Sequence, residues 1–161
     1  MTVDTLTFRE ALGRFASGVC IVTVAGANGR PIGVTISSFS SLSLQPPLVL
    51  FCMGKRSSNL DAWLTATHFS VNVLSETQQS LSELFASQAT SKFNGVPGSI
   101  GQNGCFRLDG ALAILECRRS AAHEQGDHYI LVGLVENVAH IDDGGPLLRF
   151  RGAYRHLSAQ G

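Results

Sequence analysis

Residues 35–38, Thr-Ile-Ser-Ser, carry groups that suit the polar edge of a flat ring. They follow an apolar strand-like run and lead into a serine-rich stretch that we expect to be a loop, ended by Pro46-Pro47. Hydroxyls and backbone N–H groups placed there can stabilise negative charge that develops on a bound ring. The alternative is a turn in which each hydroxyl bonds to its own backbone.

The segment Gly54-Lys-Arg-Ser-Ser-Asn59 suits a phosphate group. It follows the apolar run 48–53, which we expect to be a strand buried on both faces, and Ser57 or Ser58 is expected to cap a short helix. Helix N-termini attract anions, and nearby lysine or arginine adds a screened attraction. A solvated capping turn explains the same residues equally well.

Composition excludes several functions. The chain has 161 residues, which suits one domain with one core. Its 12 basic and 12 acidic residues cancel and form no run of like charge, so a nucleic-acid partner is not expected. The G-x-G-x-x-G, G-x-x-x-x-G-K-[ST] and G-x-S-x-G patterns are missing, so any nucleotide-like ligand must be held in another way.

Cysteine and histidine spacing excludes a metal site. The four cysteines form no C-x-x-C pair, and the five histidines do not cluster with carboxylates or cysteines at ligand spacing. Cysteines inside apolar runs are typical of small buried hydrophobes in a reducing compartment. The N-terminus shows no signal peptide and no apolar stretch is long enough to span a membrane, so we expect a cytoplasmic protein without a membrane partner.

Apolar periodicity predicts many strands and a few short helices. A first helix is expected to open with the capping box Thr7-x-x-Glu10 and to end at Gly18, with Phe8, Ala11, Leu12, Phe15 and Ala16 at helical spacing. A helix opened by Ser75-x-x-Gln78 follows later, and residues 87–105 are expected to be a long functional loop. Strands are expected over residues 19–25, 32–36, 48–53, 68–74, 111–122, 128–141 and 147–150. This order favours an antiparallel all-β barrel with peripheral helices.

Ordered motifs over residues 8–155 resemble the short-chain flavin reductase family. They are Phe8-Arg9-x-Ala11-Leu12-Gly13-x-Phe15-Ala16-Ser17-Gly18-Val19, Gly33-x-Thr35-x-Ser37-Ser38-Phe39, Pro46-Pro47-Leu48-Val49, Phe69-x-Val71-Asn72-Val73-Leu74, Leu81-Ser82-x-x-Phe85-Ala86, Lys92-Phe93, Gly126-Asp127-His128 and Phe150-x-Gly152-x-Tyr154-Arg155. The resemblance implies one domain over residues 1–161. Its fold would be mostly β, an antiparallel FMN-binding split β-barrel of Greek-key type with a few short peripheral helices.

The resemblance also implies an activity. Members of the family pass a hydride from NADH or NADPH to FMN or FAD and release the reduced flavin. That flavin often serves a separate monooxygenase, or it reduces ferric iron or oxygen. Members are typically homodimers with the flavin near the interface. We therefore expect flavin and a nicotinamide donor as the cofactors of this chain, with NADH favoured.

The residues and the resemblance together predict a flavin site. Backbone and hydroxyl groups of the first segment would meet the ring, those of the second segment would meet the phosphate, and Cys52 would lie beneath the ring. The predicted contacts are Thr35, Ile36, Ser37, Ser38, Cys52, Met53, Lys55, Ser57, Ser58, Asn59, Ala86, Lys92, Phe93, Phe150 and Tyr154.

His128 is predicted to position the nicotinamide. It follows a tight turn at the start of a strand, and hydride transfer needs no base, so a positioning role is favoured over acid–base catalysis. The alternative is a turn histidine bonded to Asp127. Phe150, Tyr154 and Arg155 are predicted to complete the nicotinamide side, although core packing explains Phe150 almost as well.

Two other functions stay open on the sequence. A flavin-dependent oxidase or oxygenase would need its own substrate pocket, for which residues 87–105 are available. A non-enzymatic flavin carrier would tolerate loss of the nicotinamide side, so the intact Gly126-Asp127-His128 motif disfavours it.

Overall fold

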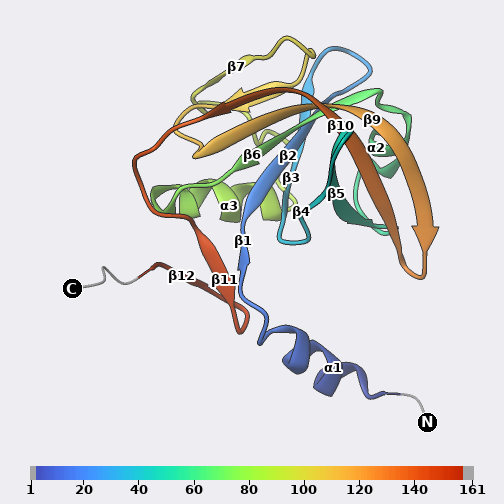
Figure 1. Cartoon of the computed structure of the whole chain (residues 1–161), viewed down its shortest axis with the longest axis vertical. Helices are drawn as coiled ribbons and strands as arrows, with labels where there is room; N and C mark the ends of the chain where they lie inside the picture. Colours follow the sequence, from blue (N-terminus) through green and yellow to red (C-terminus); the bar gives the residue numbers. More distant parts are fainter. Residues whose placement is uncertain (1–2, 158–161) are drawn as a thin grey trace.

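A computed structural model describes residues 3–157, which form antiparallel sheets with three short α-helices beside them (Figure 1). The helices are α1 (Thr5–Leu12), α2 (Leu60–Thr65) and α3 (Gln79–Ala86), and a 3-10 turn η1 (Glu76–Gln78) precedes α3. The strands are β1 (Ser17–Gly18), β2 (Cys20–Ala25), β3 (Pro31–Ile36), β4 (Ser40–Leu44), β5 (Pro47–Gly54), β6 (His68–Val73), β7 (Gly98–Ile100), β8 (Phe106–Leu108), β9 (Ala113–Gln125), β10 (His128–His140), β11 (Leu148–Phe150) and β12 (Ala153–Arg155).

The main sheet has seven strands in the order β3-β2-β6-β9-β10-β5-β4. Its two edge strands, β3 and β4, follow each other directly in the chain and are joined by residues 37–39. At this corner the Cys52 backbone N–H donates to Ser38 Oγ over 2.9 Å, which ties the link to β5. The sheet thus curls until its edges meet at one corner and leaves β3 unpaired along its outer side. This confirms the expected antiparallel barrel with a split.

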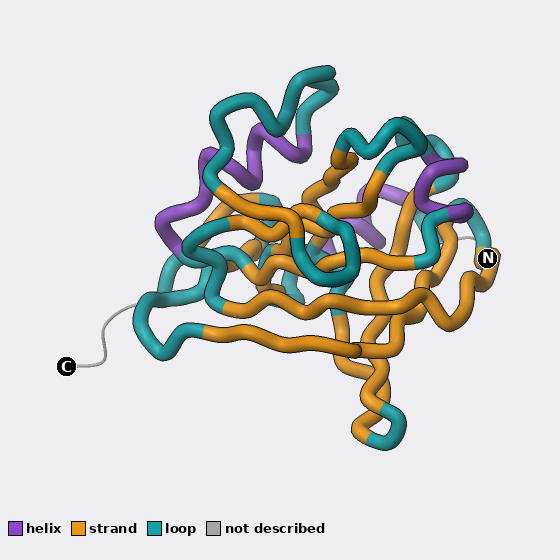
Figure 2. The backbone as a smooth tube through the Cα atoms, turned by 90° about the horizontal axis from the view of Figure 1, so that it is seen from above, coloured by secondary structure: helices purple, strands orange, loops and turns teal. Residues whose placement is uncertain are grey.

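One apolar cluster fills the barrel. It combines side chains from six strands and α2, and its largest fully enclosed member, Phe51, stands edge-on to the rings of Trp63 and Phe69. A second cluster, which includes Ile21, Leu74 and Phe85, lies on the other side of β2. Figure 2 shows strands through most of the molecule, with a helix and the long loop after it along one side. The barrel is a packed core, so a ligand has to bind outside it.

Strand β2 is buried on both faces, whereas the expectation of two-sided burial for residues 48–53 is wrong. Five successive residues of β2 are buried, because one apolar cluster lies on each of its faces. In β5, burial alternates: Val49, Phe51 and Met53 are buried, whereas the residues between them are half-buried. The burial of β5 side chains alternates with a period of two residues, because no second layer covers the outer face of the sheet there.

The first helix differs from the prediction in its cap and its end. The Thr7 backbone N–H donates to Asp4 over 2.9 Å, so Asp4 caps the helix and the proposed box at Thr7 does not form. The helix ends at Leu12, because Gly13 closes it with bonds to carbonyls in its last turn. Among the described residues α1 buries none, and Phe15 is 80% exposed. Figure 1 shows α1 standing away from the sheet.

Three further boundaries differ. The serine-rich stretch expected to be a loop contains the edge strand β4, which pairs with β5. Asn59, with a left-handed φ of 61°, takes the cap position of α2 in place of Ser57 or Ser58. The predicted loop 87–105 contains β7, which pairs with β8. In contrast, the capping box at Ser75 and Gln78 is confirmed.

Gly33 allows α3 to approach the edge strand β3. A Cβ at this position would lie 2.6 Å from Cε1 of Phe85 and 3.0 Å from Cζ of Phe93. Both rings are held in edge-to-face packing, with centroids 4.9 Å apart, so neither can move aside freely.

We predict that Gly33→Ala lowers the free energy of unfolding by about 1–3 kcal/mol, because overpacking must displace a buried ring. Urea denaturation followed by circular dichroism measures this. Gly18→Ala is the matched control, since nothing lies within 4 Å of its Cβ position. Equal stability of the two variants would show that α3 does not press on β3.

Candidate functional site

Two cavities follow each other along β3, and we call them together the β3 cleft. The larger, about 390 Å³, lies between the start of β3, the segment Ser57–Asn59 and the loop after α3. The smaller, about 180 Å³, lies beside the end of β3. The larger is lined by Pro31, Ile32, Gly33, Val34, Ser57, Ser58, Asn59, Trp63, Ser87, Gln88, Ala89, Thr90, Lys92 and Phe93. The smaller is lined by Val19, Thr35, Ile36, Ser37, Ala86, Arg149 and Tyr154.

Residues 35–37 lie in the smaller cavity, and a brace to α3 holds them. Thr35 Oγ1 donates to the Ser82 carbonyl over 2.7 Å, and Ser82 Oγ lies 2.8 Å from the Tyr154 hydroxyl. These hydroxyls are therefore engaged by the protein itself. Because β3 is an edge strand, its outward backbone groups are the polar groups left to face the cavity.

The residues of the second segment that were predicted to bind a phosphate line the larger cavity. Ser57, Ser58 and Asn59 line it together with Lys92, which comes from the loop after α3. Lys92 Nζ donates to the Phe85 carbonyl over 2.9 Å, and burial lowers the pKa of the Lys92 ammonium. The Lys92 ammonium and the hydroxyls of Ser57 and Ser58 thus lie at one end of the cleft. Such groups can donate hydrogen bonds to an anionic ligand.

Lys55 is held away from this group by an ion pair. Its Nζ lies 2.5 Å from Glu124 Oε1 at the tip of the β9–β10 hairpin, and this contact raises the pKa of Lys55. The same contact lowers the pKa of Glu124. Both side chains are partly exposed, so the pair adds little stability. It keeps the ammonium beside the hairpin.

Other predicted residues lie beside the cleft. Met53 is buried in the barrel core, and Cys52 is half-buried with its N–H bonded to Ser38. Ala86 and Phe93 line the cleft, and Phe93 also packs edge-on against Phe85. Phe150 lines an adjoining groove that shares Ser37 with the smaller cavity. The expected contacts thus divide into lining residues and residues that support them.

His128 stands at the end of β10, opposite Gly54. Its Nδ1 lies 2.7 Å from Asp127 Oδ1, and this bond lowers the pKa of Asp127. The contact is the one that the turn interpretation predicts. It also fixes the ring, whose Nε2 would lie 3.6 Å from a Cβ placed on Gly54. With Nδ1 occupied by Asp127, Nε2 is the nitrogen left for an incoming group.

Several lining residues escaped the sequence analysis. Trp63 is the single tryptophan and has helical spacing with Leu60, which made it look like core alone. Residues 87–90 carry small polar side chains without a motif. Arg149 directly precedes the Phe150-x-Gly152 motif. Neighbouring residues of a strand point to opposite faces, so this position could have indicated that Arg149 lines the smaller cavity, which Phe150 does not.

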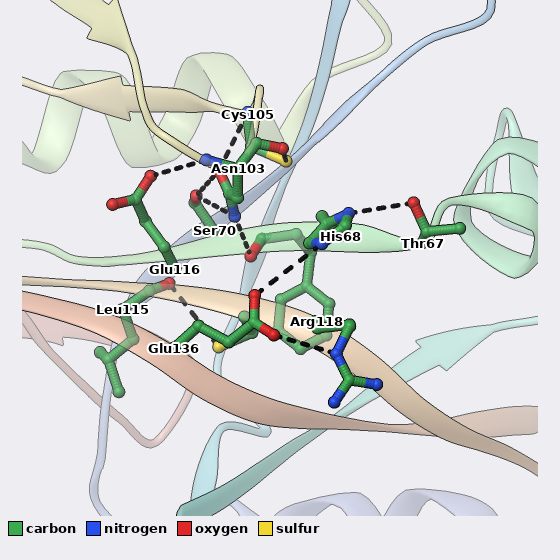
Figure 3. Close-up of polar contacts among 11 residues, drawn as sticks. Thr67, His68, Ser70, Asn103, Cys105, Leu115, Glu116, Arg118 and Glu136 are labelled. Atoms are coloured by element: carbon green, nitrogen blue, oxygen red, sulfur yellow. Dashed lines mark hydrogen bonds and ion pairs between the residues drawn. The ribbon is translucent and has the colours of Figure 1, made fainter.

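A separate polar cluster lies over β6 and β9, at the turn before β8 (Figure 3). Asn103 donates through Nδ2 to the Phe69 carbonyl and to Ser70 Oγ, and its N–H reaches the buried Glu116. These groups satisfy one another, as buried polar groups must, so the cluster holds the turn in place. Within residues 3–157, no group of three His, Cys, Asp or Glu side chains can hold a metal. No described helix is long and apolar enough to cross a membrane.

Comparisons with known proteins agree on one family. The model of the flavin reductase like domain matches residues 12–158. The FMN reductase (NADH) SmoA of Agrobacterium fabrum is 46% identical over 96% of this chain and 87% of its own length. The reductase subunit HsaB of a flavin-dependent monooxygenase from Rhodococcus jostii is 40% identical over 94% of this chain and 77% of its own.

A solved structure shows the same fold. The NADH:FAD oxidoreductase of Streptomyces globisporus, in complex with NAD and FAD fragments, superposes with a TM-score of 0.92 at 33% identity, over 99% of this chain and 98% of that one. The barrel, the cleft beside its split and these matches lead to one conclusion. The chain belongs to the flavin reductase family.

Proposed function

We propose that this protein is an NADH:flavin oxidoreductase that binds its flavin in the β3 cleft. The observation that carries this is the order of groups along the cleft: edge-strand backbone at residues 35–37 at one end, and Ser57, Ser58 and Lys92 at the other. A flavin has the same order, a polar ring at one end and a phosphate at the other. The relatives named as NADH-dependent flavin reductases support the assignment.

The chain's residues fit a flavin by charge and by shape. Backbone N–H groups at the free edge of β3 can donate to the ring where negative charge gathers on reduction. Lys92, fixed by the Phe85 carbonyl, can meet the phosphate together with Ser57 and Ser58. When bound, the flavin supplies the hydride-accepting chemistry. The protein orients it, and Ala86 and Tyr154 bound the ring end of the cleft.

His128 and its neighbours are proposed to orient the electron donor. The Asp127 carboxylate accepts from Nδ1, which leaves Nε2 as an acceptor for the amide of a nicotinamide. The role is positional, because a hydride moves without a proton donor or acceptor. The turn of the β9–β10 hairpin and the start of β10 lie beside Gly54 and Lys55, so the donor would approach from that side of the barrel.

The reduced flavin is proposed to serve a separate flavin-dependent monooxygenase. A relative named as the reductase subunit of such a monooxygenase, 40% identical over 77% of its own length, supports this. We further infer one domain over residues 1–161. A reducing compartment such as the cytoplasm fits the four free cysteines.

A homodimer is proposed from the apolar surface of α1 and β4. In the described chain α1 buries no residue, and Leu6, Phe8 and Leu12 are more than half exposed. On the edge strand β4, Leu44 is 90% exposed. An eight-residue helix is not stable in water without packing, so a second copy is expected to cover this surface.

The activity is tested by mixing purified protein with NADH and following absorbance at the NADH band. We expect oxidation whose rate rises with added FMN or FAD and saturates. A protein that oxidises NADH only when a further organic substrate is present would instead be an oxygenase. A protein that binds flavin but leaves NADH and NADPH unchanged would be a carrier.

His128→Ala is predicted to raise the KM for NADH about tenfold, the equivalent of ~1.4 kcal/mol, with flavin affinity unchanged. Flavin affinity is measured independently of turnover, by quenching of the single tryptophan, Trp63, which lines the cleft. His140→Ala is the control, because this histidine lies at the far end of β10. Equal loss of flavin binding in His128→Ala would show that the histidine belongs to the flavin seat.

Leu12→Glu is predicted to convert the dimer to a monomer, because a carboxylate on the covered helix face would be buried without a partner. Light scattering after size exclusion measures the mass. Ile100→Glu, at an exposed apolar residue of β7, is the control and should leave the mass unchanged. A wild-type protein that elutes as a monomer would refute the dimer.

A further inference from the structure

Arg149 is the one charged side chain of residues 3–157 that lines the smaller cavity of the β3 cleft. It belongs to β11, and Thr35, Ser37 and Tyr154 line the cavity with it. No acidic side chain of the described chain takes part in this lining. The cavity therefore carries a positive charge that nothing in its own wall balances.

The charge of Arg149 is not neutralised by a neighbour outside the cavity either. Within residues 3–157 its guanidinium forms no ion pair, and neither do those of Arg9 and Arg151, which line the adjoining groove between α1 and the β11–β12 hairpin. Lys55 shows the contrast, because Glu124 holds its ammonium in an ion pair. Arg149 is exposed, so water screens its charge, and a ligand that displaces this water strengthens its field.

A chain of contacts orients the Arg149 guanidinium. In the β11–β12 ladder Arg149 lies directly opposite Tyr154, and its Cζ lies 5.3 Å from the centre of the tyrosine ring. The Tyr154 hydroxyl lies 2.8 Å from Oγ of the buried Ser82, whose carbonyl accepts from Thr35 Oγ1 over 2.7 Å. Stacking on a ring leaves the N–H groups at the edge of the guanidinium plane free to donate. These contacts fix Arg149 relative to the edge strand β3.

Arg149 shares the smaller cavity with residues 35–37 of the edge strand, whose backbone N–H groups are neutral donors. A guanidinium beside them adds a full positive charge, and charge-assisted hydrogen bonds are about twice as strong as neutral ones. Such a group acts most strongly on the form of a ligand that carries negative charge. Arg149 is therefore placed to favour reduced flavin over oxidised flavin.

We propose that Arg149 is a catalytic residue, which stabilises the negative charge that flavin reduction places on the ring. In the balanced step one hydride, with its two electrons, passes from NADH to N5 of the flavin, which leaves NAD⁺ and one additional negative charge on the ring. Arg149 donates hydrogen bonds to that charge and gives up no proton. This role rests on the proposed function, because the ring has to lie in the smaller cavity. It differs from the role of His128, which orients the donor.

The test compares the affinities of the full-length protein for oxidised and for chemically reduced FMN. Both are measured anaerobically by quenching of Trp63, which does not depend on turnover. We expect wild type to bind reduced FMN more tightly. Arg149→Gln is expected to weaken reduced FMN about tenfold and to leave oxidised FMN unchanged. For a two-electron couple this change corresponds to a midpoint potential of bound FMN that is lower by about 30 mV.

Two further variants separate the charge of Arg149 from its shape and from the charge of its surroundings. Arg149→Lys should recover part of the affinity for reduced FMN, because it keeps the charge without the planar set of donors. Arg151→Gln is the control, since it removes the same charge from the same hairpin. Arg151 Cζ lies 5.1 Å from the centre of the Phe150 ring, and Arg151 does not line the smaller cavity. This variant should bind both forms of FMN like wild type.

A kinetic measurement distinguishes Arg149 from the residues that bind the donor. In anaerobic stopped flow, Arg149→Gln should reduce bound FMN about tenfold more slowly at saturating NADH, whereas the NADH concentration that gives half the maximal rate stays unchanged. His128→Ala is expected to show the opposite pattern. All variants must elute like wild type on size exclusion.

Three results would overturn the inference, and they differ in what they say about the proposed function. Equal loss of oxidised and reduced FMN in Arg149→Gln would show that this residue only shapes the cavity. Unchanged affinity for both forms would show that it does not contact the ring. In either case NADH oxidation that depends on FMN would leave the proposed function standing. A wild-type protein that binds neither form of FMN would refute the proposed function and this role together.

Discussion

The free outer edge of β3 is the constraint on which the rest of this structure depends. A seven-stranded sheet that curls on itself would close if β3 and β4 paired, but the short link at residues 37–39 turns the chain away and α3 packs beside β3 instead. Gly33 and Thr35 make that packing possible, one by lacking a side chain and the other by bonding to Ser82. The result is a cleft whose wall is unpaired backbone, outside a filled core.

The charge of the lining residues differs along the β3 cleft and the groove that adjoins it. Lys92 and two serines stand at one end, the strand backbone occupies the middle, and arginines follow past Ser37. Acidic side chains gather elsewhere, at the tip of the β9–β10 hairpin, where Glu124 and Asp127 engage Lys55 and His128. Anionic ligands are thus attracted along β3, while the hairpin side stays close to neutral and suits the uncharged end of a donor.

Structural features that depend on residues close together in the chain could be predicted from the sequence, and features that depend on distant residues could not. The capping box at Ser75 forms as expected because both partners lie within one turn. At the N-terminus two such caps competed, and Asp4 replaced Thr7 because its carboxylate reaches the Thr7 N–H and hydroxyl together. Strand positions followed from periodicity. Which strand lies between two cores did not, because burial of β2 depends on α3 and β8, far along the chain.

The candidate site shows the same division. The order of Thr35, Ser37, Ser57 and Ser58 indicated a ring seat and a phosphate seat, and the family resemblance added Lys92. The pairing of Lys55 with Glu124 joins residues 69 positions apart and has no local signal. The arginines of β11 and its turn were equally hidden, since their grouping with Arg9 depends on how the last hairpin returns to the first helix.

A crystal structure of the protein with FMN tests the central claim most directly. The account predicts electron density for the ring against the backbone of residues 35–37, with the phosphate beside Ser57, Ser58 and Lys92. Density instead in the cavity beneath α2, lined by Ala25, His68 and Asn103, with the β3 cleft left free of ligand, would contradict it.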